Sequence, residues 1–129
     1  MLELSQAFVD DFITQAFGLP IAHENESYEP TRGTTWVRLR MFPGQVVAGD
    51  VNADTLETAG FFQVTLNYPS GEGAIPAKQQ LQTIFNAYPL GRRVSYSGES
   101  ARVTSHQQFD ASNESGWFQV VGRIFYEKE

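Results

Sequence analysis

The amino-acid sequence predicts an α+β domain: a mostly antiparallel sheet of four to five strands, with an N-terminal helix and one crossover helix packed on one face. Two segments repeat apolar residues at three- and four-residue steps, the period of an α-helix. Other segments alternate apolar and polar residues, the period of a strand. Because helix, strands, helix and strands follow in that order, we expect hairpins around a single crossover helix.

The first predicted helix covers residues 4–17. An apolar residue recurs at every fourth position from Leu4 to Ala16, which places one apolar stripe along a helix. Gly18 and Pro20 then end it. Within this helix the neighbouring acids at positions 10 and 11 point about 100° apart. We therefore expect solvated helix surface there and not a carboxylate pair.

The first long strand is predicted over residues 36–42. Residues 24–35 before it are polar and turn-rich, which indicates a loop, and residues 21–22 are compatible with a short edge strand. Along 36–42 the sides alternate: Val37, Leu39 and Met41 face one way, and Trp36, Arg38, Arg40 and Phe42 face the other.

The middle of the chain predicts a second strand and an arm. Residues 45–58 follow no period, which is compatible with a long loop or an extended hairpin arm, and long loops are commonly functional. Residues 61–68 alternate again. The two strands therefore form an antiparallel pair joined by a projecting arm or loop at about 43–60.

The second half of the chain predicts a helix and then strands. Residues 74–88 carry an apolar stripe, with Pro76 in the first turn and with Pro89 and Gly91 after the end. Residues 92–97 and 101–109 predict short polar strands, 112–116 predict a turn, and 117–126 predict the final strand. Gly122 within that last strand indicates either a bulge or close packing.

Composition limits the classes of function. The 129 residues suit one domain, 1–129, and the net charge of −6 argues against general nucleic-acid binding. The absence of cysteine excludes disulfides and thiolate metal sites. The N-terminus lacks the basic start of a secretion signal, and no apolar run is long enough to cross a membrane, so we expect a cytoplasmic product.

Catalytic and metal-binding patterns are missing from the sequence. The two histidines, His23 and His106, lie far apart, and there is no nucleophile elbow or zinc motif. Residues 50–54 imitate the start of a calcium loop, but Thr55 and Phe61 stand where glycine and glutamate are needed. The sequence therefore predicts no enzyme, no metal and no cofactor.

One strand face has the composition of a contact surface. Trp36, Arg38, Arg40 and Phe42 share a face, and the chain holds seven arginines against two lysines. Protein interfaces favour aromatic residues and arginine over lysine. The alternative is a strand whose arginines pair with acidic neighbours in the same chain.

The order of motifs resembles that of phage tail-terminator-like proteins over roughly residues 4–127. The similar stretches, in order, are Tyr28-Glu29-Pro30, Thr35-Trp36-Val37-Arg38-Leu39, an extended arm, Gly60-Phe61-Phe62-Gln63-Val64, the turn 68–73 with the helix from Ala74, and Gly116-Trp117-Phe118-Gln119-Val120. The resemblance implies a ring, commonly a hexamer, at the head-proximal end of the tail tube, which stops tube polymerisation and offers a surface for joining the head.

The resemblance also implies the partners and the location. These are further copies of the chain (with a monomer possible in isolation), the tail tube protein and head–tail connector proteins; DNA only passes through the pore. The place is the virion tail, and the bacterial cytoplasm during assembly. The candidate interface residues are Trp36, Arg38, Arg40, Phe42, Val46, Val47, Val51, Leu56, Arg92 and Arg93.

Two alternatives stay open at this point. The first is a head–tail adaptor or head-completion protein. The second is a small ligand-binding or enzymatic α+β domain, because a fold does not determine a function. That second alternative requires Arg92, Arg93 and His106 to meet in a pocket.

Overall fold

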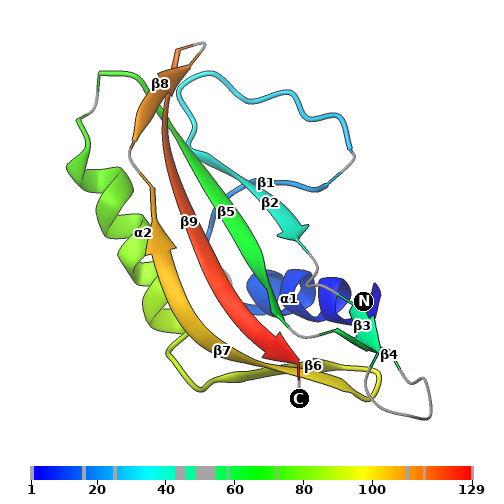
Figure 1. Cartoon of the computed structure of the whole chain (residues 1–129). Coiled ribbons are helices and arrows are strands. Elements are labelled where there is room, and N and C mark those ends of the chain that lie inside the picture. The colour runs from blue at the N-terminus through cyan, green and yellow to red at the C-terminus, as the bar shows by residue number, and fades with distance from the viewer. Residues whose placement is uncertain are drawn as a thin grey trace.

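The computed structural model describes the chain except residues 1, 16, 25, 43–45, 49–54, 58, 72, 110, 115 and 129. Its elements along the chain are α1 (Leu2–Gln15), β1 (Ile21–Ala22), β2 (Trp36–Phe42), β3 (Val46–Ala48), β4 (Thr55–Glu57), β5 (Ala59–Pro69), α2 (Ile75–Ala87), β6 (Arg93–Tyr96), β7 (Glu99–Gln108), β8 (Ser112–Glu114) and β9 (Trp117–Lys128). The fold is mixed α+β, as predicted (Figure 1).

The main sheet has seven strands in its described part, where four to five were predicted. Its order is β1-β2-β5-β9-β7-β6, and β8 pairs with β9 off this path. Only the β1–β2 pair among these is parallel. The short strand β1 lies where residues 21–22 were expected to be compatible with an edge strand, whereas β8, with three residues, falls in a predicted turn and is too short for alternation to be recognised.

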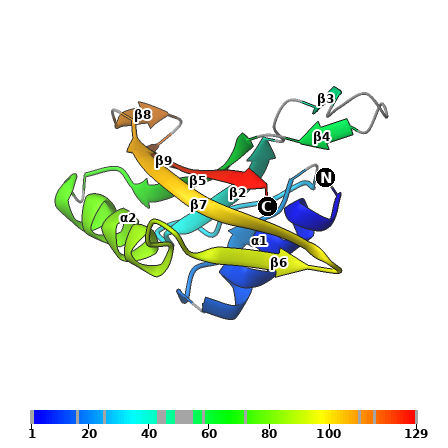
Figure 2. The ribbon, with the colours of Figure 1, turned by 60° about the horizontal axis from the view of Figure 1, so that its bottom comes forward.

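Both helices cover the same face of the sheet. The Phe8 ring of α1 lies 5.5 Å from the Phe62 ring and 5.2 Å from the Tyr126 ring, centre to centre. Leu81 of α2 reaches Gly122. The register pairs Phe62 with Ile124, so these contacts lie on one side of β5 and β9. Figure 2 shows α1 and α2 together below the sheet.

Gly122 marks close packing between α2 and β9, one of the two predicted alternatives. A Cβ atom at this position would lie 2.6 Å from Leu81 Cδ1 and 2.8 Å from Phe85 Cζ. Carbon atoms in contact normally stay about 3.5–4.0 Å apart. The absence of a side chain therefore lets α2 lie directly on the strand.

An irregularity in β7 changes which side chains face the helices. Val103 opposes Tyr126, but Ser105 opposes Phe125, so the register shifts by one residue between them. A bulge of this kind reverses the inward and outward phase of the strand beyond it. As a result His106 opposes Ile124 and faces α2.

Strands β3 and β4 form a separate two-stranded antiparallel sheet, in which Val47 opposes Leu56. Both views place these strands apart from the main sheet (Figures 1 and 2). The described parts of 43–60 thus pair as strands. The rest of the predicted arm, including the calcium-like residues 50–54, lies outside the described residues.

Candidate subunit interface

The outer face of the sheet, opposite the helices, carries a row of three aromatic rings. The register places Phe42, Phe61 and Phe125 side by side on β2, β5 and β9. The first two rings stack with centres 4.5 Å apart, and the second and third lie 5.4 Å apart. All three side chains are half-buried although no helix covers this face. The row is therefore apolar surface that neither helix shields.

Arginine side chains lie over this row. The Arg40 guanidinium sits 4.5 Å from the centre of the Phe42 ring. Arg123 lies 4.3 Å from the Phe61 ring and 4.4 Å from the Phe109 ring, and its Nε donates to Gln63 Oε1 at 3.0 Å. Each such contact contributes about 0.5–1 kcal/mol at exposed positions. Aromatic rings therefore hold the Arg40 and Arg123 guanidinium groups in place, and among the described residues neither group has an ion pair with an acid.

We call this surface the basic aromatic face and define it by seven residues: Arg38, Arg40, Phe42, Phe61, Gln63, Arg123 and Phe125. Among the described outer-face residues of β2, β5, β7 and β9, the one acid is Glu127. Its carboxylate is already paired with Arg102 at 3.4 Å. The face is positive although the chain as a whole is negative.

Trp36 lies on the same side of β2 as Arg38 and Arg40, but other rings cover it. Its side chain is only 7% exposed, because the Tyr28 ring stacks on it at 4.9 Å and the Trp117 ring meets it edge-on at 5.9 Å. Arg38 packs over it at 5.4 Å. Sequence alternation placed Trp36 on the correct side of the strand, but its burial leaves little of the ring to touch a partner. The aromatic surface is instead supplied by Phe61 and Phe125, whose place beside Phe42 depends on strand register.

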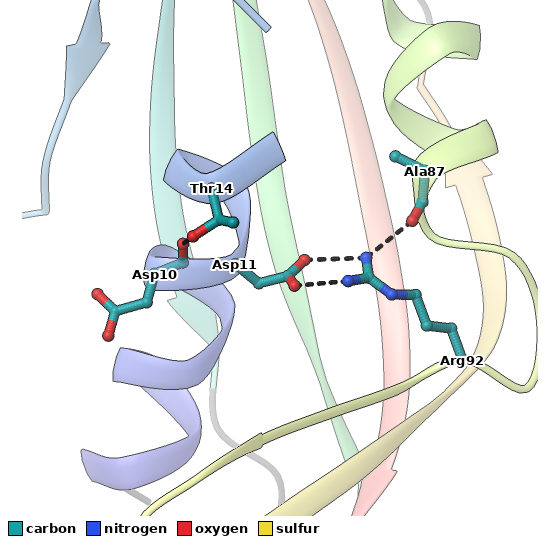
Figure 3. Close-up of polar contacts among 5 residues, drawn as sticks. All are labelled: Asp10, Asp11, Thr14, Ala87 and Arg92. Carbon is teal, nitrogen blue, oxygen red and sulfur yellow. Dashed lines mark hydrogen bonds and ion pairs between the residues drawn. The ribbon is translucent and has the colours of Figure 1, made fainter. Parts of the chain in front are cut away.

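Arg92, a second predicted interface residue, is engaged inside the chain. Its guanidinium donates to both carboxylate oxygens of Asp11 at 2.9 and 2.5 Å, and to the Ala87 carbonyl at 2.8 Å (Figure 3). The two charged side chains are 27% and 19% exposed. Arg92 thus ties α1 to the end of α2, and its role as an interface residue stays a prediction.

The expectation of solvated acids on α1 holds for one of the two. Asp10 points away from the ion pair, and its backbone carbonyl accepts a hydrogen bond from Thr14 Oγ1 at 2.8 Å (Figure 3). Asp11, one position further, faces Arg92. The prediction was wrong for Asp11 because its partner lies 81 residues away in the sequence.

The end of α2 also uses His106. Its Nε2 lies 2.5 Å from the Tyr88 carbonyl oxygen, and its ring stacks on Phe85 at 4.5 Å. Arg92 and His106 therefore both satisfy backbone carbonyls that a helix C-terminus leaves without partners. The Tyr88 hydroxyl is buried with no hydrogen-bond partner among the described residues, and burial, with the nearby Asp11 carboxylate, raises the pKa of Tyr88.

This arrangement does not form the pocket that the enzymatic alternative needs. Arg93 is exposed on the edge strand β6, while Arg92 and His106 hold carbonyl groups. A hollow of about 560 Å³ lies elsewhere, lined by Pro30, Arg32, Gly33, Pro69, Ser70, Gly116 and Trp117. Its described lining holds no carboxylate or imidazole that could act as a base.

The remaining candidates lie on the arm. Val46, Val47 and Leu56 belong to β3 and β4, of which the backbone is described, and Val51 lies outside the described residues. Within the described part of the chain no three His, Asp or Glu side chains come together to hold a metal ion. No described helix is long and apolar enough to span a membrane.

Comparisons with known proteins give a family and a fold. A family described as phage tail terminator protein matches residues 3–126. No curated protein sequence matches. One similar solved structure, of a protein known by a sequence identifier alone, has a TM-score of 0.80 at 21% identity and covers 98% of this chain and 93% of that one. Another, from the virion of a native gene transfer agent particle, has a TM-score of 0.58 at 18% identity and covers 98% and 91%.

Proposed function

Because the chain belongs to the phage tail terminator family, a family of structural proteins, we propose that it caps the head-proximal end of the tail tube as a ring of identical copies. The ring ends polymerisation of the tube and provides the surface that joins the head. The protein works in the virion tail and is made and assembled in the host cytoplasm. Its partners are further copies, the tube protein and the head–tail connector.

The basic aromatic face is the observation that supports self-assembly most directly. Arginine and aromatic residues are enriched at the centres of protein interfaces. Here they cover a sheet face that neither helix shields, and the Arg40 and Arg123 guanidinium groups stack on rings, with no ion pair to an acid in the part of the chain that the structure describes. A closed ring needs two different complementary surfaces on each copy, and this face suits one of them.

The charge of the chain suits a ring around DNA. Each copy carries a net charge of −6, and a ring of copies multiplies that negative charge around its channel. Phosphates are repelled by such a potential, so passing DNA does not adhere. The similar fold found in a gene transfer agent virion supports a place in the particle.

Deletion of the gene in the phage tests the proposal, with tail length measured by electron microscopy. We expect overlong tails without heads, and normal lengths after the wild-type chain is restored. Tails of normal length without heads would instead establish the head–tail adaptor alternative. Normal infectious particles would refute both the terminator proposal and the adaptor alternative.

A second test uses the purified protein. Size-exclusion chromatography of the chain alone, and electron microscopy of the chain mixed with isolated tail tubes, should show one cap at one end of each tube. A rigid dimer that does not bind tubes would contradict the proposal.

A further inference from the structure

We infer that the acidic loop of one copy, residues 26–31, docks on the basic aromatic face of the neighbouring copy in the ring. The inference rests on the proposed ring and names two surfaces that meet in it. The loop lies between β1 and β2 and carries two carboxylates, Glu26 and Glu29, with no lysine or arginine. The face carries exposed arginines beside a row of half-buried phenylalanine rings.

The charges of the two surfaces are complementary. Arg38 and Arg40 are exposed on β2 and pack on aromatic rings. Glu26 and Glu29 are exposed too, and among the described residues neither has an ion pair. Opposite charges across an interface steer association and set the register of the two partners.

The loop holds the acids that remain available to a partner. Every other acid whose side chain the structure describes already accepts a hydrogen bond or forms an ion pair within its own chain. These acids are Asp10, Asp11, Glu24 and Glu127. A neighbouring copy that is attracted to the basic aromatic face can therefore present Glu26 and Glu29 to it.

The loop is ordered before it meets a partner. The Tyr28 ring, between the two glutamates, stacks on the buried Trp36 ring with centres 4.9 Å apart. The Thr34 amide donates to the Thr31 carbonyl at 3.0 Å and closes a turn after the loop. A segment that is already ordered loses less entropy on binding, so the anchored loop is a suitable docking element.

The contact also covers apolar surface. Phe42, Phe61 and Phe125 are half-buried, and neither helix shields them. The loop offers Pro30, which is exposed beside Glu29. Proline-containing segments pack on aromatic surfaces, so the loop can contribute apolar contact together with charge.

The positions of loop and face make the contact directional, as a ring requires. Strand β1 ends the strand order, and the connection that follows it swings out beyond the edge of the sheet, whereas the face spans β2, β5 and β9 (Figure 1). A two-fold contact of face with face would bring the arginines of both copies together, and like charges repel. Two different surfaces instead repeat from copy to copy until the ring closes.

Charge reversal on each surface tests the contact. A face variant carries Arg38→Glu and Arg40→Glu, and a loop variant carries Glu26→Arg and Glu29→Arg. All four positions are exposed, and circular dichroism verifies that both variants fold. Each variant alone should cap tail tubes at least about tenfold less well than wild type, because like charges then meet at every contact.

Mixing the two variants shows whether the contact joins different copies. In a ring where they alternate, every loop meets a face of opposite charge, so the equimolar mixture should cap tubes nearly as well as wild type. A contact within one chain would not be restored by mixing. If the mixture caps no better than either variant alone, or if the face variant alone caps as well as wild type, the inference is overturned.

A control separates local charge from net charge. The variant Lys78→Glu, Gln79→Glu, Gln82→Glu makes the same change of net charge as the face variant, but at exposed positions of α2. It should cap tubes normally. A loss as large as that of the face variant would attribute the effect to net charge and would overturn the inference.

Cysteine cross-linking is an independent test, because the chain has no cysteine of its own. One variant carries Ser27→Cys, an exposed position between the loop glutamates. The other carries Thr65→Cys, whose side chain lies on the outer face between Arg38 and Val121 in the register. On tail tubes a short bismaleimide should join the two variants into a covalent dimer, and Gln79→Cys in place of Thr65→Cys should give none.

The outcomes separate this inference from the proposed function. If wild-type rings cap the tubes but the mixture fails or the cross-link does not form, the contact between loop and face is refuted and the terminator role stands. If the wild-type chain never caps tubes, the proposed function itself fails.

Discussion

Substitution of Gly122 by alanine probes the contact between α2 and the sheet. The new Cβ would lie 2.6 Å from Leu81 Cδ1 and 2.8 Å from Phe85 Cζ. Because carbon atoms in contact need about 3.5–4.0 Å, α2 or both side chains must withdraw by about 1 Å. Overpacking of this kind costs about 1–3 kcal/mol.

A smaller effect opposes this cost. Alanine loses less backbone entropy than glycine on folding, which is worth about 0.5–1 kcal/mol in a strand. We therefore expect Gly122→Ala to lower the free energy of unfolding by about 1–2 kcal/mol. At this chain length each kcal/mol corresponds to about 4 °C, so the Tm should fall by about 4–8 °C.

The assay is thermal and urea unfolding followed by circular dichroism, with a double-mutant cycle as control. Leu81→Ala alone should cost about 2–5 kcal/mol by leaving a cavity. In the double variant the added methyl group enters that space, so the combined loss should be smaller than the sum by about 0.5–3 kcal/mol. A Gly122→Ala protein as stable as wild type, or strictly additive losses, would refute the close-packing argument.

Three further predictions concern the end of α2. Arg92→Met should lower stability by about 2–3 kcal/mol in urea unfolding, more than Asp11→Asn, because it leaves a carboxylate and a carbonyl without their donor; equal, small losses would contradict this. His106→Phe keeps the stack on Phe85 but loses the hydrogen bond, so its loss of about 1 kcal/mol in the same assay should be smaller than that of His106→Ala. Burial raises the pKa of Tyr88 in the folded protein, so the hydroxyl does not lower the free energy of unfolding below about pH 10. Above that value the unfolded chain ionises at this group first, and the free energy of unfolding falls as the pH rises. Tyr88→Phe should leave stability at neutral pH nearly unchanged and should reduce the loss measured between about pH 9 and pH 11; identical pH profiles would count against a raised pKa.

Local sequence pattern determined the helices and the long strands of this protein. The three- and four-residue repeat located α1 and α2, and alternation located β2 and β5, because near neighbours in the chain set these periods. The apolar and aromatic run after a turn located β9. The same reasoning placed Arg38 and Arg40 on the outer side of β2. Gly122 also stood out in the sequence, since a strand interior rarely has a reason to hold glycine except packing or a bulge.

Tertiary structure alone decided what these elements touch. Asp11 pairs with Arg92, which lies 81 residues away in the sequence. The bulge in β7 turns His106 toward α2. Neither contact follows from the spacing of apolar residues along the chain. Strand register likewise assembled Phe42, Phe61 and Phe125 into one row, although they come from three separate strands. The physical reason is that each alternation defines two sides of a strand, whereas pairing between distant strands and the seating of both helices decide which side stays open to a partner.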